Sequence, residues 1–125
     1  MRIAFSTESK EGLKSIISYH FGRCKYYTIV DIDENNQVKK VIDIDNPYVN
    51  NHGPGVVPQF IKEQNVDVMI AGGMGARAAD FFKQFNIEVA TGAEGTVEES
   101  LKLFLNGKLN GYTPCKDASD DHCSD

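Results

Sequence analysis

The chain has 125 residues, of which 41% are hydrophobic and 25% are charged, a composition typical of one globular domain rather than a disordered segment. Its net charge of −5 at pH 7 disfavours non-specific attraction to nucleic acid or to an anionic membrane surface. No apolar run approaches the roughly 20 residues of a membrane span, and no signal peptide is visible, so we expect a cytoplasmic protein with reduced cysteines.

The first half of the chain predicts three strands. Residues 2–6 indicate a short, largely buried strand, and the polar stretch 7–19 predicts a long loop that could hold a helical turn. Residues 26–33 and 38–45 each alternate apolar and polar side chains. The Asp-Glu-Asn-Asn sequence between them favours a turn, so these two strands should form a hairpin.

The second half predicts helices and strands in alternation. A helix over 56–64 tolerates Pro58 because this residue falls in its first turn. The apolar run 66–71 is typical of a strand covered on both faces. A helix over 76–84 and a strand over 87–90 follow, and Thr96 with Glu99 forms a capping box for a last helix that ends near residue 106. We expect a domain over 1–112 and a flexible acidic tail over 113–125.

This order of elements predicts an α/β fold with a five-stranded mixed sheet ordered 3-2-1-4-5. Right-handed crossovers place the fourth and fifth strands parallel to the first, with the hairpin on its other side and helices on both faces. The layout resembles the three-layer ribonuclease H-like fold. The carboxyl ends of the first, fourth and fifth strands would then share one edge, where open α/β sheets usually bind ligands.

Two motifs supply candidate binding residues for this edge. His20 and Cys24 lie four residues apart in the sequence His-Phe-Gly-Arg-Cys, and imidazole and thiolate suit soft or borderline metals. The alternative is that His20 hydrogen-bonds its loop and Cys24 packs as a small apolar residue. Arg23, within the same motif, could neutralise a bound anion or be a solvated surface charge.

The second motif is the glycine turn Gly72-Gly73-Met74-Gly75 between a predicted strand and a predicted helix. Its backbone N–H groups could meet an anion or a cluster sulfide, or Gly72, Gly73 and Gly75 could serve only to turn the chain tightly. Arg77 follows in the helix and has the same two interpretations as Arg23.

His52 and the tail supply the remaining candidates. His52 precedes a helix N-terminus, where it could bind an anionic ligand or cap the helix. Cys115, His122 and Cys123 could capture a metal, although their spacing is a weak zinc signal and a plain solubilising tail is the alternative.

The chain resembles the dinitrogenase iron–molybdenum cofactor biosynthesis family, the NifX-like proteins and the C-terminal domain of NifB, over about residues 1–110. The matching segments are Ile3-Ala4, the motif at 20–23, the strand 27–31, Asn46-Pro47, residues 52–55, the run 66–75 with Arg77 and Ala78, and residues 95–99. The resemblance implies a ribonuclease H-like fold and a role in holding or delivering an iron–sulfur or iron–molybdenum cluster or its precursor. It supports His20 as a ligand, whereas Cys24 and the tail lie outside the family motif.

We therefore expect a non-enzymatic carrier of such a cluster, which exchanges it with cofactor-assembly proteins. One alternative is a small regulatory module that binds a partner protein without metal. A metal-dependent hydrolase is a weaker alternative, because two-metal nucleases place a carboxylate on the first strand and this strand has none.

Overall fold

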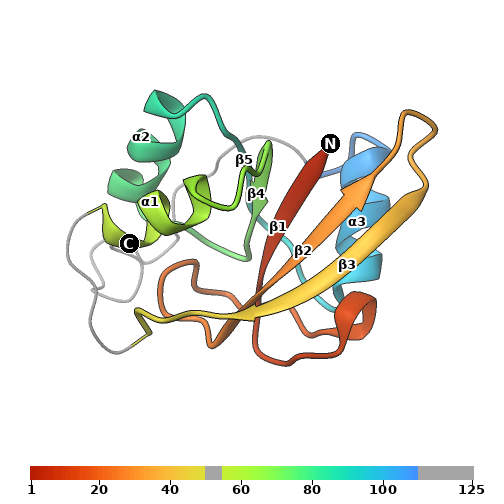
Figure 1. The fold of residues 1–125 in the computed structure, drawn as a ribbon, viewed down its shortest axis with the longest axis horizontal. Coiled ribbons are helices and arrows are strands. Elements are labelled where there is room, and N and C mark those ends of the chain that lie inside the picture. Colours follow the sequence, from red (N-terminus) through yellow and green to blue (C-terminus); the bar gives the residue numbers. More distant parts are fainter. Residues whose placement is uncertain (50–54, 110–125) are drawn as a thin grey trace.

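The computed structural model describes residues 1–49 and 55–109, in which a mixed sheet lies between helices (Figure 1). The elements are, in chain order, β1 (Arg2–Thr7), a 3-10 helix η1 (Gly12–Lys14), β2 (Tyr26–Ile32), β3 (Val38–Asp45), α1 (Val56–Lys62), β4 (Val68–Ile70), α2 (Ala76–Gln84), β5 (Glu88–Ala90) and α3 (Val97–Leu105). Every predicted strand and helix is present, and η1 is the helical turn expected in the long loop.

The sheet has the predicted order, β3-β2-β1-β4-β5. Strand β1 pairs antiparallel with β2 and parallel with β4, while β5 is parallel to β4. The β2–β3 hairpin turns at Asn36, whose φ of 63° shows the left-handed conformation that asparagine tolerates. The carboxyl ends of β1, β4 and β5 therefore share one edge, as the sequence predicts.

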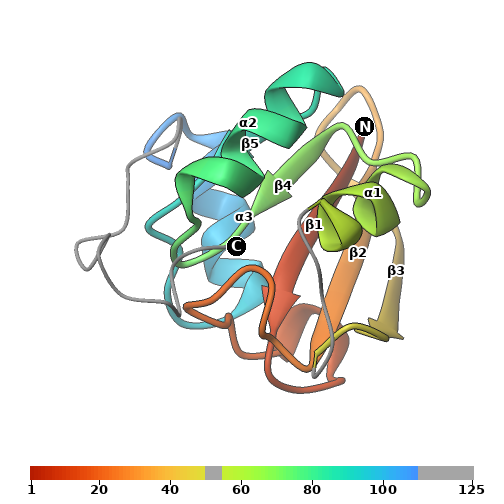
Figure 2. The same cartoon turned by 90° about the vertical axis from the view of Figure 1, so that its left-hand side faces the viewer.

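Helices cover both faces of this sheet, which gives the predicted three layers (Figure 2). One core lies under α1 and α2, where Val57, Ile61 and Phe82 meet sheet residues such as Tyr27 and Met69. The other core lies under α3, where Val97 and Leu101 pack with sheet residues from the opposite face. Neighbouring residues of β1 belong to different cores, which explains why five of its six residues are buried.

An asparagine follows each of the helices α1 and α2. Asn65 lies three residues after the end of α1 and Asn86 two residues after the end of α2, with φ values of 62° and 61°, so each provides a left-handed residue of the kind that commonly follows a helix. The end of α1 at Lys62 is two residues before the predicted end. The capping box of α3 is present as predicted, with Thr96 Oγ1 accepting from the Glu99 amide at 3.2 Å.

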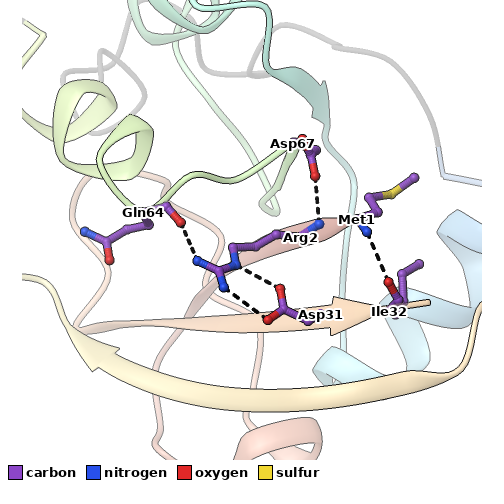
Figure 3. A network of polar contacts seen from close by, with 6 residues as sticks. All are labelled: Met1, Arg2, Asp31, Ile32, Gln64 and Asp67. Carbon is purple, nitrogen blue, oxygen red and sulfur yellow. Dashed lines mark hydrogen bonds and ion pairs between the residues drawn. The ribbon is translucent and has the colours of Figure 1, made fainter.

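A polar network holds the amino end of β1 (Figure 3). The Arg2 guanidinium donates to both carboxylate oxygens of Asp31, at 2.8 and 3.2 Å, and to the Gln64 carbonyl at 2.8 Å. The Arg2 amide donates to Asp67 at 2.8 Å. These bonds tie β1 to β2 and to the start of β4, so this end of the sheet is occupied by structural contacts. The other end is the candidate binding edge.

None of the helices in the described part of the chain has the length and apolar character that crossing a membrane requires.

Candidate functional site

An extended segment, residues 15–20, crosses the carboxyl edge of the sheet (Figure 2). Its Ser18 amide donates to the Ser6 carbonyl of β1 at 2.7 Å, and Ile17 forms an antiparallel bridge with Thr7. Further along, His20 forms a parallel bridge with Gly73. The segment therefore connects β1 to the turn after β4, and it brings the two predicted motifs together.

Gly72 is required because two backbones meet closely at this turn. A Cβ atom at Gly72 would lie 2.6 Å from the Tyr19 Cα and 3.1 Å from the Ser18 carbonyl oxygen. Its amide donates to that carbonyl at 3.1 Å, and the Gly73 amide donates to the Tyr19 carbonyl. These two N–H groups are engaged by the protein, which favours the structural interpretation of Gly72 and Gly73 over anion contact.

Gly75 precedes α2 and leaves its N-terminus without a side-chain cap. The residue is extended, with φ −74° and ψ 158°, and no side chain accepts from the first turn in the described structure. The first amides of an α-helix have no acceptor within the helix and carry partial positive charge. Since Ala76 and Arg77 are exposed, this terminus rather than the glycine amides can meet an anion.

The loop 20–24 is held rigidly by three side chains. Asn46, only 4% exposed, donates its side-chain amide to the Gly22 carbonyl at 3.1 Å and to the Cys24 carbonyl at 2.9 Å. The Tyr27 hydroxyl donates to the Phe21 carbonyl at 2.7 Å. Asn46 is part of the Asn46-Pro47 segment that resembles the family, but the sequence does not indicate that its side chain holds this loop.

Cys24 is the third of these side chains. It is fully buried, and its sulfur lies 3.3 Å from the Phe21 carbonyl and 3.1 Å from the Tyr26 carbonyl. Burial raises the pKa of its thiol to about 12, so the group is protonated at neutral pH. A metal ligand must be a thiolate. The structure thus favours the packing interpretation of Cys24 over ligation.

His20 and the two arginines have more accessible positions. The His20 side chain is half-buried and its ring meets the Tyr19 ring edge-on, with centroids 5.0 Å apart. Arg23 and Arg77 are exposed, the first three residues after His20 and the second in the first turn of α2. Both arginines therefore belong to elements that meet at the 72–75 turn.

A cavity of about 350 Å³ lies beside α2 and begins at its first residue. Its walls are mostly apolar, and its two charged side chains are of opposite sign. The cavity is therefore suited to apolar groups rather than to an anion. In this respect it differs from the adjacent N-terminus of α2, which attracts negative charge. The lining residues are Ala76, Ala79, Asp80, Lys83, Ile87 and Val89.

Several predicted ligands lie outside the described residues, namely His52 in the 50–54 gap and Cys115, His122 and Cys123 in the tail. Within residues 1–49 and 55–109, no three His, Cys, Asp or Glu side chains gather as a metal site would need. The described part of the edge thus offers one imidazole, a helix N-terminus and two guanidinium groups.

Comparisons with known proteins agree with this fold and edge. An uncharacterized protein of Methanocaldococcus jannaschii, MJ0580, is 37% identical over 98 residues, which are 77% of this chain and 82% of that protein. The crystal structure of PH0822 has a TM-score of 0.76 and 36% identity, and covers 94% of this chain and 99% of its own. The apo form of the orange protein from Desulfovibrio gigas also has a TM-score of 0.76, with 26% identity over 92% of this chain and 96% of its own.

A family model described as dinitrogenase iron–molybdenum cofactor matches residues 1–107, which include every described residue of the edge. The chain therefore belongs to the dinitrogenase iron–molybdenum cofactor family.

Proposed function

We propose that this protein is a non-enzymatic carrier of an iron–sulfur or iron–molybdenum type cluster, or of its precursor, which binds at the carboxyl edge of the sheet. The observation that supports this most is the backbone pairing of His20 with Gly73, because it places His20 beside the turn that leads into the uncapped N-terminus of α2. An imidazole can ligate an open metal position, while the helix terminus attracts the negative charge of a cluster.

The set of groups fits a preassembled cluster better than a bare metal ion. A bare ion takes most of its ligands from the protein, four for a structural zinc. Here the described residues bring one imidazole to the edge, and Cys24 is protonated and buried. A cluster brings its own sulfides and needs few protein ligands, so His20 with electrostatic support from Arg23 and Arg77 is a sufficient set. We expect His52 and the tail residues to add to it.

The family and its relatives support this class of function. The structure of the orange protein of D. gigas is described as that of an apo form, and a Thermotoga structure with 28% identity is called a putative NifB protein. Transfer of the cluster to and from cofactor-assembly proteins in the cytoplasm is part of the proposal. A nuclease function is disfavoured by β1, whose sequence Arg-Ile-Ala-Phe-Ser-Thr has no carboxylate for Mg²⁺.

Anaerobic reconstitution of the full chain tests the proposal. The protein is incubated with iron and sulfide, or with tetrathiomolybdate and a second metal, and then desalted. We expect a visible absorption band and a stoichiometric metal content. A colourless and metal-free product under all of these conditions would contradict the carrier function and favour a regulatory module without metal.

Variants of single side chains then locate the cargo. We expect His20→Ala to lower the amount of bound metal. Arg23→Ala or Arg77→Ala should weaken retention at low salt, and this effect should shrink as salt is raised. Lys40→Ala is the matched control, because Lys40 is an exposed cation on the distant β3 strand. A Cys115→Ser/Cys123→Ser double variant shows whether the tail contributes. Equal loading of the His20 and Lys40 variants would refute the proposed site.

A further inference from the structure

Two apolar side chains are exposed on the segment that crosses the binding edge. Ile16 is 48% exposed and Tyr19 is 45% exposed, whereas Ile17 and Ser18 between them are buried. The backbone that carries them is fixed by β1 on one side and by the 72–73 turn on the other. An apolar pair on a fixed backbone can bind a partner with little ordering cost.

Exposed acidic residues lie near Ile16 in two other parts of the chain. The Glu8 amide donates to the Ile16 carbonyl at 2.8 Å, and Ile16 forms an antiparallel bridge with Thr96 at the start of α3. Glu94 and Glu98 lie two residues before and after Thr96, and the side chains of all three glutamates are exposed. The exposed Lys14 offsets only part of this negative charge.

We propose that this surface, Ile16 and Tyr19 with the acidic rim Glu8, Glu94 and Glu98, docks a partner protein through an apolar side chain flanked by lysine or arginine. Charge complementarity identifies the partner, since a basic segment is attracted by the rim and an acidic one is repelled. The apolar pair then supplies a desolvated centre, as in protein interfaces whose energy is concentrated in a few buried side chains.

The position of the surface links docking to the cargo. Ile16 and His20 are four positions apart in the sequence, about 13 Å along an extended chain. A partner bound over Ile16 would therefore lie beside the edge that holds His20. That this partner donates or accepts the cluster rests on the proposed carrier function, whereas the docking itself does not.

A random peptide library displayed on phage provides a defined probe. The library is selected against the metal-free full chain, and enriched peptides are synthesised and titrated by fluorescence anisotropy. We expect enriched peptides to combine lysine or arginine with an aromatic or aliphatic residue. Ile16→Glu should weaken their binding about tenfold or more, as removal of an interface anchor does. Leu103→Glu is the control, because Leu103 is 41% exposed on α3 but outside this surface.

The charged rim is tested separately. We expect Glu94→Gln/Glu98→Gln to weaken binding about threefold at low salt and to have no effect near 1 M salt, where surface charges are screened. Glu34→Gln/Glu63→Gln removes two exposed carboxylates elsewhere and should have no effect. Glu99 is left intact because its carboxylate accepts from the Thr96 amide at 3.0 Å and maintains the helix cap.

Three outcomes would overturn the docking proposal: enrichment of uncharged or acidic peptides, failure to enrich any peptide, or equal binding to the Ile16 and Leu103 variants. Sedimentation velocity that shows an Ile16-dependent dimer would also overturn it, since a second copy would then cover the surface. Metal reconstitution of Ile16→Glu distinguishes the two proposals. If Ile16→Glu loads metal normally but does not bind the peptides, the carrier function remains intact. If the wild type binds the peptides but loads no metal, only the docking surface remains supported.

Discussion

Substitution of Gly72 by alanine should separate the segment 15–20 from the turn after β4. The new Cβ would lie 2.6 Å from the Tyr19 Cα, which is backbone and cannot rotate away. Overpacking of this kind costs about 1–3 kcal/mol. The amides of Gly72 and Gly73 would also lose good geometry toward the Ser18 and Tyr19 carbonyls, at about 1 kcal/mol each.

The reduced entropy of the unfolded chain offsets about 0.4–1 kcal/mol of this cost, because alanine is less free than glycine. The expected net loss is therefore about 2–4 kcal/mol, which corresponds to a decrease in Tm of roughly 8–15 °C for a chain of this size. Urea unfolding followed by circular dichroism measures it directly.

Gly107→Ala is the matched control for the Gly72 substitution. Its Cβ would meet nothing within 4 Å, and its φ of 73° carries only the local cost of a left-handed residue, about 1 kcal/mol. If Gly72→Ala were as stable as the wild type, or lost no more than Gly107→Ala, the close approach would not be the reason for a glycine at position 72.

Two further predictions concern titratable groups. The Arg2 guanidinium lowers the pKa of Asp31, so their ion pair stabilises the folded protein above the ordinary carboxyl pKa of 3.8 and this stabilisation is lost as the pH falls through the lowered pKa. In urea titrations, Asp31→Asn should cost about 1 kcal/mol at neutral pH and little near pH 2, because the pair is partly exposed; an equal cost at both pH values would contradict this. Because burial raises the pKa of Cys24 to about 12, its thiol should react with a disulfide reagent only after unfolding, as measured in the Cys115→Ser/Cys123→Ser variant. Rapid reaction of that variant in native buffer would show that Cys24 is accessible.

The fold could be predicted because its determinants are local or periodic. The near-continuous apolar run 66–71 contains the interior strand β4, while Thr96 and Glu99 mark the start of α3 within four residues. In the structure β4 is shorter than this run, Val68–Ile70, and after Ala71 the chain pairs with the segment 15–20. The end of α2 at Gln84 agrees with the prediction, whereas α1 ends at Lys62, two residues before its predicted end, because a single asparagine in a polar stretch is a weak signal for a helix end.

The contacts that build the edge could not be predicted in this way, because they join residues distant in sequence. Ser18 pairs with Ser6 on one side and with Gly72 on the other, and nothing in the polar sequence 7–19 indicates an extended segment between them. Asn46 reaches back to Gly22 and Cys24 across the β2–β3 hairpin. The imidazole and the thiol of the His20 motif both suggest metal ligands. Burial keeps the Cys24 thiol protonated, however, and the sequence of a short loop does not show which of its residues are buried.

The hydrogen bonds at the glycine turn change how a cargo could be held. Because the Gly72 and Gly73 amides donate to Ser18 and Tyr19, these two groups position the segment that carries His20 and are less available to an anion. In the proposed site, positive potential would then come mainly from the N-terminus of α2 and from Arg23 and Arg77. It follows that Gly72→Ala should impair both cluster loading and peptide docking, since both depend on the segment 15–20. Arg77→Ala should impair loading alone, because Arg77 lies on α2 and outside the docking surface.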